Sequence, residues 1–376
     1  MKLGFLQGVY EQQGPFATVY LDTSGDAEDA GKAIELRWRS AREQLSEAGA
    51  DETTLQIIDE ALQEPQRTSG NRGLVIVGNS DGVVFSDELP DRPGDFSDDE
   101  LATYGPVPAL FPYLRMRGTR IPHVIAVVDR EGADITTVRA TLASKTTEVE
   151  GDADLLHKSH TGGGAGSEQR QQNAVEENRK HNAGQVAEEI SKRAAAINAE
   201  AIVLAGDPQQ RQLVRQDIRK GLQPLVVETE AGHRDPNASE ESLQQEVSET
   251  VGAVVDDRVQ SVISDFERER GEHSRATEGW ESTVAAVQRG QVETLLRAVP
   301  DASERPSTLH IGPSQADIAT SESALTDMGV QGVQTAPADS ALVRGLAGTD
   351  SALVLVDSEK VSLSGGIGAV LRYTEG

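Results

Sequence analysis

The sequence predicts an α/β fold built from three domains, on the strength of its length and two recurring patterns. A chain of 376 residues exceeds what one core usually supports, since domains commonly hold roughly 100–200 residues. Short apolar runs rich in β-branched residues alternate with stretches in which apolar residues recur at helical spacing. Polar or proline-rich segments separate three such regions, so we place the domains at residues 1–118, 119–232 and 233–376.

The first region predicts strands and two amphipathic helices. A strand is expected at residues 16–23, helices at 28–48 and 52–64, and a pair of strands around the turn Ser80-Asp81-Gly82. The segments "LPDRPGDF" and "YGPVPALFPYL" are rich in proline and are expected to be irregular.

The second region combines a hairpin with a strand–helix–strand unit. Residues 121–129 and 133–142 are expected to pair, with a third strand at 145–149. Beyond a glycine-rich segment and a long helix, "AEAIVLAGD" is a continuous apolar run that suits a strand buried on both faces. "PQQRQLVRQDI" then predicts a helix and "LQPLVVET" a further strand, which together form a βαβ unit.

The third region opens with a long charged helix at residues 240–270, which we expect to be interrupted near Gly252. Helical and strand patterns then alternate to the end of the chain. The last of these, "KVSLSGGIGAVLRYTEG", combines glycines with an apolar strand.

Composition limits the function. The chain has 62 acidic and 35 basic residues and thus a net charge of −27. This excess of acidic residues resembles the composition of proteins from salt-loving organisms. Such a charge opposes nonspecific RNA binding at low salt. At molar salt the Debye length is about 3 Å, so the repulsion between the acidic chain and RNA is screened. Without cysteine, disulfides and Cys-ligated zinc are excluded. No apolar run reaches the ~20 residues of a membrane span and no secretory signal is visible, so a cytoplasmic protein is expected.

Familiar catalytic motifs are absent. The glycine-rich segment is followed by Ser167-Glu168 instead of the Lys-Ser/Thr pair of a phosphate-binding loop, and the acidic residue would repel phosphate. His157 and His160 lie in a polar segment and His181 lies beyond the glycines, so we expect no metal site and no cofactor. There is no Gly-x-Ser-x-Gly elbow.

The most unusual feature is "GGGAGSEQRQQNAVEENRKHNAGQVAEEI", residues 162–190. An apolar stripe at Val186, Ile190, Ala194 and Ile197 is expected to dock on the sheet, but the preceding turns have almost nothing to bury. Their amide and guanidinium groups suit RNA backbone and base edges, and glycines permit close backbone approach to a partner. The alternative is a surface loop capping a solvated helix, and the residues alone leave both open.

Several segments resemble the archaeal and eukaryotic class-one release factors and Pelota. In that superfamily a Gly-Gly-Gln loop precedes a polar helix with an Arg/Lys-His-Asn cluster and a strand ending in Ala-Gly. Here Arg179-Lys180-His181-Asn182 and Leu204-Ala205-Gly206 stand in that order. "SGGIGAVLRY" is similar to the end of the superfamily's third domain. The N-terminal "GPFATVYLDTSGDAEDAGKAIELRWRSAREQL" resembles its bacterial branch, which includes mycobacterial members and the hibernation factor Balon.

The resemblance implies a bacterial-type N-terminal α/β domain, an RNase H-like middle domain and a ribosomal-protein-like α/β third domain. It also implies a factor that occupies the tRNA A site and contacts rRNA, for hibernation or rescue of idle or stalled ribosomes. The candidate ribosome- and RNA-binding residues are Gly162, Gly163, Gly164, Gly166, Ser167, Gln169, Arg170, Arg179, Lys180, His181 and Asn182. An elongation-factor-type translation GTPase is an implied partner.

Arg372 and Tyr373 are candidate anchors for that partner, because arginine and tyrosine are favoured at interfaces. The alternative is that Leu371 and Tyr373 close the sheet of their own domain.

Two departures from the family pattern matter. No Asn-Ile-Lys-Ser motif is present, so decoding of stop codons is not expected. Counted back from His181-Asn182, the Gly-Gly-Gln triplet falls on Ala165, Gly166 and Ser167, and Gln169 comes two residues late. Release of nascent chains by a peptidyl-tRNA hydrolase, with Gln169 and Ser167 as its catalytic candidates, is therefore the alternative function. An acidic stress protein with no ribosomal role is a third.

Overall fold

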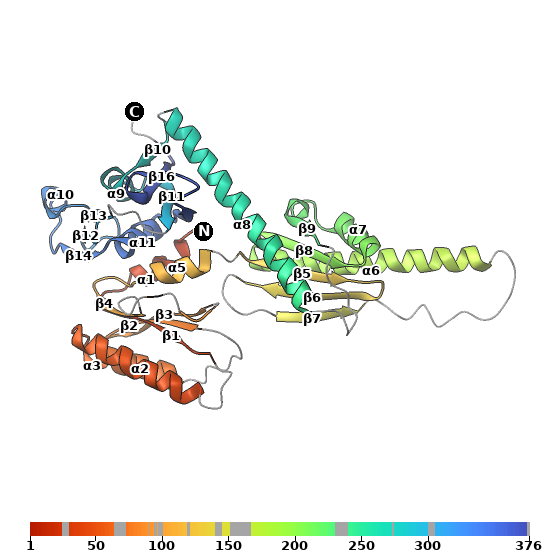
Figure 1. The fold of residues 1–376 in the computed structure, drawn as a ribbon, viewed down its shortest axis with the longest axis horizontal. Helices are drawn as coiled ribbons and strands as arrows, with labels where there is room; N and C mark the ends of the chain where they lie inside the picture. Colours follow the sequence, from red (N-terminus) through yellow and green to blue (C-terminus); the bar gives the residue numbers. More distant parts are fainter. Residues whose placement is uncertain are drawn as a thin grey trace. The chain divides into compact units, whose positions relative to one another are not determined.

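The computed structural model confirms a mixed α/β protein (Figure 1). The chain forms two compact units: residues 1–118 with 258–376, and residues 119–257. The division into three domains remains a prediction, since the first and last segments pack into one unit. The structure describes residues 1–24, 30–63, 73–89, 91–93, 96, 101–118, 121–139, 145–150, 167–229, 240–272, 274–299 and 305–373.

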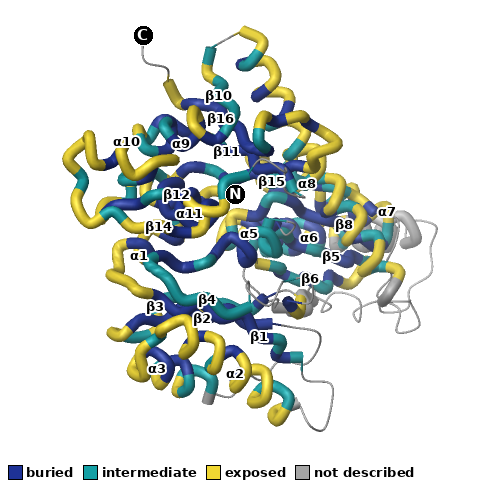
Figure 2. The backbone as a smooth tube through the Cα atoms, turned by 60° about the vertical axis from the view of Figure 1, so that its left-hand side comes forward, coloured by how far each residue is buried: buried dark blue, intermediate teal, exposed yellow. Residues whose placement is uncertain are grey.

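The N-terminal segment contains an antiparallel sheet with strand order β3-β2-β1-β4. Helices α2 and α3 pack on one face through buried residues such as Trp38, Leu45 and Ile58, and their outer faces are exposed (Figure 2). As predicted, two of these strands flank the turn at Ser80 and Asp81. The elements are β1 (Phe16–Asp22), α2 (Ala30–Glu47), α3 (Glu52–Gln63), β2 (Gly73–Asn79), β3 (Gly82–Leu89) and β4 (Ala102–Gly105).

The prediction that "YGPVPALFPYL" is irregular holds for residues 106–110 and is wrong at both ends. Its start belongs to β4, and helix α5 (Phe111–Gly118) begins near its end. Pro112 is the second residue of that helix, where its missing N–H costs no intrahelical hydrogen bond. The first four residues of α5 are buried, and the Tyr113 N–H donates to the Tyr20 hydroxyl at 3.2 Å. Burial of its aromatic and aliphatic side chains therefore outweighs the proline signal.

The C-terminal segment of this unit adds two sheets, with strand orders β10-β16-β11-β15 and β13-β12-β14. Strands β11 and β15 are parallel, and β16 runs antiparallel to β10 and β11. The elements are β10 (Ala276–Glu278), α9 (Trp280–Gln288), β11 (Val292–Val299), β12 (Thr308–Ile311), β13 (Ile318–Ala319), α10 (Glu322–Asp327), β14 (Gln334–Pro337), α11 (Ala338–Gly348), β15 (Ala352–Asp357) and β16 (Ile367–Leu371).

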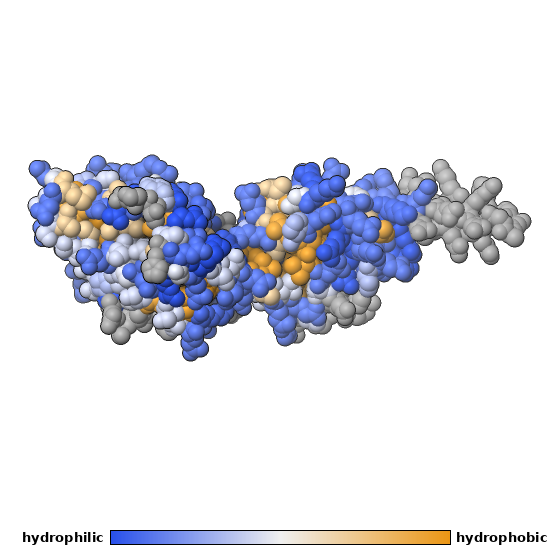
Figure 3. All heavy atoms as spheres, turned by 90° about the horizontal axis from the view of Figure 1, so that it is seen from above, coloured by the Kyte–Doolittle hydropathy of each residue, from blue (hydrophilic) through white to orange (hydrophobic). Residues whose placement is uncertain are grey.

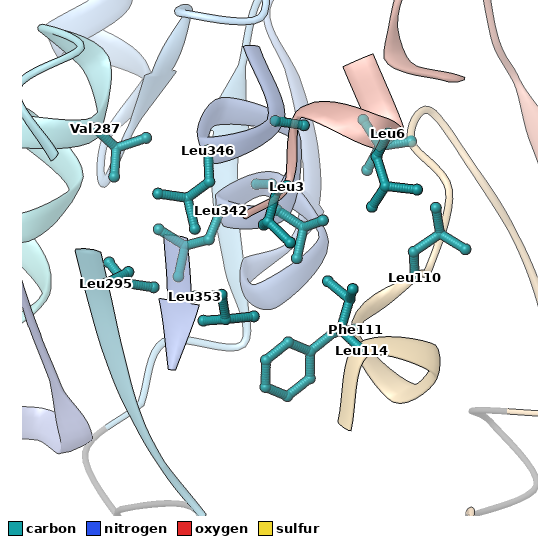
Figure 4. Close-up of a cluster of buried hydrophobic side chains, with 14 of the residues drawn as sticks. Leu3, Leu6, Leu110, Phe111, Leu114, Val287, Leu295, Leu342, Leu346 and Leu353 are labelled. Carbon is teal, nitrogen blue, oxygen red and sulfur yellow. The ribbon is translucent and has the colours of Figure 1, made fainter. Parts of the chain in front are cut away.

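The first and last segments share one hydrophobic core. Figure 4 shows leucines of the N-terminus and the side chains of α5 beside those of α9, α11, β11 and β15. Backbone hydrogen bonds join the same segments, with Leu3 N–H donating to Ser351 O at 3.0 Å and Leu353 N–H to Met1 O at 2.8 Å. The core is continuous across these segments because their apolar faces are buried against each other.

The second unit is built on a five-stranded sheet with order β7-β6-β5-β8-β9. The predicted hairpin and third strand are confirmed as an antiparallel ladder, and the βαβ unit as parallel pairs of β8 with β5 and β9. The elements are β5 (His123–Val128), β6 (Gly132–Val138), β7 (Lys145–Glu150), α6 (Ser167–Ile197), β8 (Ala201–Gly206), α7 (Pro208–Asp217) and β9 (Val226–Glu228).

Helix α8 (Glu240–Gly271) is continuous through Gly252, so the expected interruption is wrong. Gly252 is exposed and costs the helix about 1 kcal/mol relative to alanine. Burial offsets this cost: Val247 and Val251 pack against Ile121, Ala201 and Val203 of the second unit. Ile263 and Phe266, nearer the C-terminal end of α8, belong to a buried cluster of the first unit.

The visible surface of both units is mainly hydrophilic (Figure 3), as the composition requires. Across the described part of the chain, no helix combines the length and apolar character needed to cross a membrane.

Candidate functional site

Helix α6 changes character along its length. Its C-terminal half packs on the sheet of the second unit, because apolar residues recur there at helical spacing. The predicted stripe is confirmed for Val186, Ile190 and Ala194, which are buried, while Ile197 is partly buried. Ala183 is the first side chain from the N-terminus of α6 that the structure describes as buried.

Residues 167–182 therefore form a helical arm that precedes the packed part of α6. At 1.5 Å per residue the arm is about 24 Å long. Figure 1 shows α6 continuing past the sheet of its own unit. The side chains described in the arm, those of 177 and 179–182, are all exposed or half-buried. Among these described side chains none is buried in the core, and Lys180 and His181 are exposed on the surface.

The Arg179-Lys180-His181-Asn182 cluster marks the junction between the arm and the packed half. Lys180 and His181 are exposed, and His181 Nε2 lies 3.2 Å from Gln185 Nε2 one turn later. Asn182 instead faces the unit, where its Nδ2 donates to the Arg130 carbonyl at 3.4 Å. Its Oδ1 is buried without a hydrogen-bond partner. The structure thus assigns Asn182 to anchoring and Lys180 and His181 to the surface.

The turn that receives Asn182 is itself fixed by Asp129. Its Oδ1 accepts hydrogen bonds from the Glu131 and Gly132 N–H groups, both at 2.8 Å. This side-chain turn holds the β5–β6 connection in one conformation and presents the Arg130 carbonyl to α6. The base of the arm is consequently tied to the most regular hairpin of the unit.

The remaining candidates lie at or before the start of α6. Gly162, Gly163, Gly164 and Gly166 fall outside the described residues, as do His157 and His160. Ser167, Gln169 and Arg170 belong to the first turn of α6. Ser167, the first helical residue, occupies the position where the family pattern expects glutamine. Bringing Gln169 to that position would require the helix to start two residues later.

The Leu204-Ala205-Gly206 motif has a structural cause. Gly206 has a φ of +96°, and a Cβ built there would lie 2.2 Å from the Val128 carbonyl oxygen. The next residue, Asp207, donates its N–H to that oxygen at 2.9 Å and accepts from two N–H groups at the start of α7. Glycine is therefore required where β8 turns into α7 beside β5.

The C-terminal motif also serves packing. Gly365 has a φ of +60°, a Cβ there would lie 2.8 Å from Trp280 Cδ1, and its carbonyl accepts from Trp280 Nε1 at 2.8 Å. Leu371 is buried in the core, whereas Tyr373 is 53% exposed. Arg372 is exposed and its Nη2 donates to the Thr349 carbonyl at 2.6 Å. Leu371 thus closes the sheet, while Arg372 and Tyr373 lie on the surface.

A surface on α7 was missed by the motif search. Arg215 lies on that helix and Arg219 and Lys220 lie just after it, and all three are exposed. A count of charges in windows along the sequence would have found the basic stretch, because it stands within an acidic chain, but not which of its side chains share the exposed face. No group of His, Cys, Asp or Glu that could hold a metal is found among the described residues.

Comparison with known families and proteins supports the resemblance. Residues 122–272, which include α6, match the family described as bacterial archaeo-eukaryotic release factor family 2. Two uncharacterized proteins of Mycobacterium tuberculosis, from strains CDC 1551 and H37Rv, are each 27% identical over 369 residues. These matches cover 98% of this chain and 96% of each relative.

Solved structures with low sequence identity are also similar. Archaeal Pelota, in a ribosome-bound model with ABCE1, is 14% identical with a TM-score of 0.41, covering 100% of this chain and 96% of that one. Dom34 of S. cerevisiae is described as a translation termination-like factor that is involved in RNA quality control and interacts with Hbs1. It is 9% identical with a TM-score of 0.38, covering 67% of this chain and 63% of that one.

Proposed function

The chain belongs, through residues 122–272, to the bacterial branch of the archaeo-eukaryotic release factor and Pelota superfamily, and on this premise we propose a ribosome-associated translation factor. In this proposal the protein occupies the tRNA A site of idle or stalled ribosomes, in hibernation or rescue. The second unit directs the helical arm and the glycine-rich segment before it toward rRNA.

One observation carries the proposal: residues 167–182 extend beyond the packed part of α6 without a described buried side chain. The side chains described there, those of 177 and 179–182, bury no apolar face, although most helical stability in proteins comes from packing such a face. Donors such as Lys180 and His181 instead suit phosphate and base-edge contacts. The anchoring of Asn182 on Arg130 O fixes where the arm leaves the unit.

Hydrolysis of peptidyl-tRNA is the competing function, and the serine at position 167 argues against it. Activation of a water molecule needs a group within hydrogen-bond reach of that water and of the reacting carbonyl. Ser167 is shorter than glutamine and lacks its amide. Gln169 is the third residue of α6, so it is displaced along the helix from the glutamine position of the family.

Cosedimentation with ribosomes at molar KCl tests the proposal. We expect the full chain to pellet with 70S ribosomes or large subunits, and a variant lacking residues 162–170 to pellet several-fold less. Lys360→Gln, an exposed change in the other unit, serves as the control. Absence of binding by the full chain would reject a ribosomal role, and equal binding by the deletion would reject the arm as the contact.

A release assay separates binding from catalysis. On stalled ribosomes carrying peptidyl-tRNA, we expect no release above background, because no glutamine stands at position 167. Rapid release that Gln169→Ala abolishes would establish the hydrolase function instead. A Gln171→Ala variant controls for general loss of helix stability in the same arm.

An elongation-factor-type translation GTPase is the proposed partner, and the exposed pair Arg372 and Tyr373 is its proposed anchor. The Arg372 guanidinium already donates to Thr349 O, which holds the side chain in place at the end of β16. Arg372→Glu should weaken GTPase binding at least tenfold and leave the melting temperature unchanged. If the melting temperature and GTPase binding both fall, or if neither changes, the partner surface lies elsewhere.

A further inference from the structure

The surface of α7 and the turn after it has a charge opposite to that of the chain. Residues 208–223 contain four basic residues, one acidic residue and five glutamines, whereas the whole chain has 35 basic and 62 acidic residues. Cations concentrated on one face of an acidic protein create a local positive potential, which attracts a polyanion.

The fold places these side chains on one face. Val214 and Ile218 are buried and Leu213 packs partly against the same core, so this side of α7 faces α6 and the sheet. Gln212, Arg215 and Gln216, on the helix, and Arg219 and Lys220, in the turn after it, are all exposed. The one acidic residue of the segment, Asp217, is also exposed, and its Oδ2 lies beside α6, where a Cβ built on Gly184 would be 3.6 Å away.

The surface beside α7 is hollowed, and four of its six lining residues carry amide or guanidinium donors. Gln212, Arg215, Gln216 and Gln223 line it together with Pro208 and Glu228. Glu228 is paired, because Arg215 Nη1 lies 2.8 Å from its Oε1 and Arg211 Nη1 lies 3.8 Å from its Oε2, so Glu228 and Arg215 partly offset each other's charge and Arg219 and Lys220 carry most of the positive potential.

Two further donors in this segment lack partners. Arg211 Nε and Gln210 Nε2 are buried without hydrogen-bond partners among the described residues, and both side chains are more than nine-tenths buried. Neither residue lines the hollow, so the donors available on this face are those of the exposed side chains.

We infer that this surface, hereafter the α7 surface (Gln212, Arg215, Gln216, Arg219, Lys220 and Gln223), binds the phosphate backbone of RNA. Exposed arginines form paired hydrogen bonds to phosphate, and glutamine amides contact backbone oxygens without selecting sequence. The identification of that RNA as rRNA rests on the proposed function. Because α7 packs against α6, the α7 surface would provide a second contact on the unit that carries the arm.

The test uses a triple variant and a charge-matched control. Arg215→Gln, Arg219→Gln and Lys220→Gln remove three positive charges from the α7 surface. Arg39→Gln, Arg268→Gln and Lys360→Gln remove three from exposed positions in the other unit. Binding to isolated large-subunit rRNA, to whole ribosomes and to an acidic protein of similar charge density is measured over a KCl series.

We expect the α7 triple variant to bind rRNA about tenfold more weakly, with a salt slope reduced in magnitude by about 2, since each phosphate contact contributes ~0.7–0.9. The control should retain wild-type affinity and slope. An unchanged slope in the triple variant, an equal loss in the control, no rRNA binding by the full chain, or preferential loss of acidic-protein binding overturns the inference. Binding of rRNA through the α7 surface without binding to ribosomes would support the inference and reject the proposed function.

Discussion

Arg297, on β11, is the largest fully buried side chain described in the structure. Its Nε donates to Asp339 Oδ1 at 3.1 Å, and its Nη1 donates to the carbonyls of Ala298 and Gly366 at 3.0 and 3.3 Å. Asp339 also accepts from Arg305 Nη1 at 2.8 Å. A buried guanidinium is tolerated only because these acceptors replace its hydration. These side chains connect β11, α11 and the Gly366 turn.

Asp339→Ala should lower the free energy of unfolding by about 3–5 kcal/mol, because it leaves the Arg297 charge buried without its carboxylate. Adding Arg297→Met to the same chain should recover much of the loss, since the methionine fills similar space without a charge. Urea unfolding of the two variants checks both expectations. A loss below about 1 kcal/mol for Asp339→Ala, or a double variant less stable than the single one, would contradict this account.

The sequence did not indicate this network. Asp339 lies 42 residues and Gly366 lies 69 residues from Arg297, so no local pattern distinguishes it from the exposed arginines. Gly206 and Gly365 are the opposite case. Each lies in a sequence motif of the family, and a positive φ together with close packing requires glycine at both positions.

At the scale of elements, the C-terminal end of α8 is tied to the loop before β10 by one carboxylate. Glu269 accepts from the Ser274 hydroxyl at 2.6 Å and from Arg275 Nη2 at 2.9 Å, and Arg268 Nη2 is 3.2 Å away. The hydrogen bond from Ser274, followed by those from the arginines, lowers the pKa of Glu269 from 4.5 to about 2. Because the folded-state pKa is lower, the stabilisation is present above about pH 4.5 and is lost toward pH 2.

Glu269→Gln should therefore destabilise the protein at neutral pH, and its difference from wild type should shrink as the pH falls below about 4.5. Urea unfolding at intervals between pH 7 and pH 3 measures that difference. Glu272→Gln, which changes an exposed carboxylate in the same stretch, is the control. A difference that stays constant across this range would show that Glu269 stabilises by packing rather than by charge.

Helices and strands could be predicted where the apolar pattern was strong. The prediction failed where a proline or glycine was taken to interrupt a helix and the burial of the neighbouring side chains was not known. The ladder of β5, β6 and β7 and the buried β8 follow directly from their apolar runs. Helix α5 was not predicted because its segment is rich in proline, although Pro112 fits the first turn of a helix. Gly252 does not break α8, since Val247 and Val251 anchor the helix on the turn before it.

For the whole molecule, the net charge of −27 predicts a response to salt. Like charges repel more strongly in the compact state, and raising KCl from 0.1 M to 2 M shortens the Debye length from about 10 Å to below ~3 Å. We expect the melting temperature to rise steadily over this range at pH 7. Near pH 4.6, the isoelectric point, the rise should largely disappear. A salt response that is equally large at both pH values would point to a cause other than charge repulsion.

The candidate site was only partly predictable from sequence. The order of the motifs predicted the cluster Arg179–Asn182. It did not predict that Asn182 turns inward onto Arg130 while Lys180 and His181 stay on the surface. That distinction depends on how α6 packs against the β5–β6 turn, 52 residues away in sequence. The α7 surface needed the fold as well, because only burial of Val214 and Ile218 shows which side chains share the outer face.

The proposed function requires the second unit to direct the arm, residues 167–182, and the glycine-rich segment before it into the A site of the ribosome. Cryo-electron microscopy of ribosomes incubated with the full chain at native salt tests it most directly. We predict density for the protein in the A site, with the N-terminal end of α6 pointing into the large subunit. Density at another site, or an arm that points away from rRNA in A-site-bound particles, would contradict it.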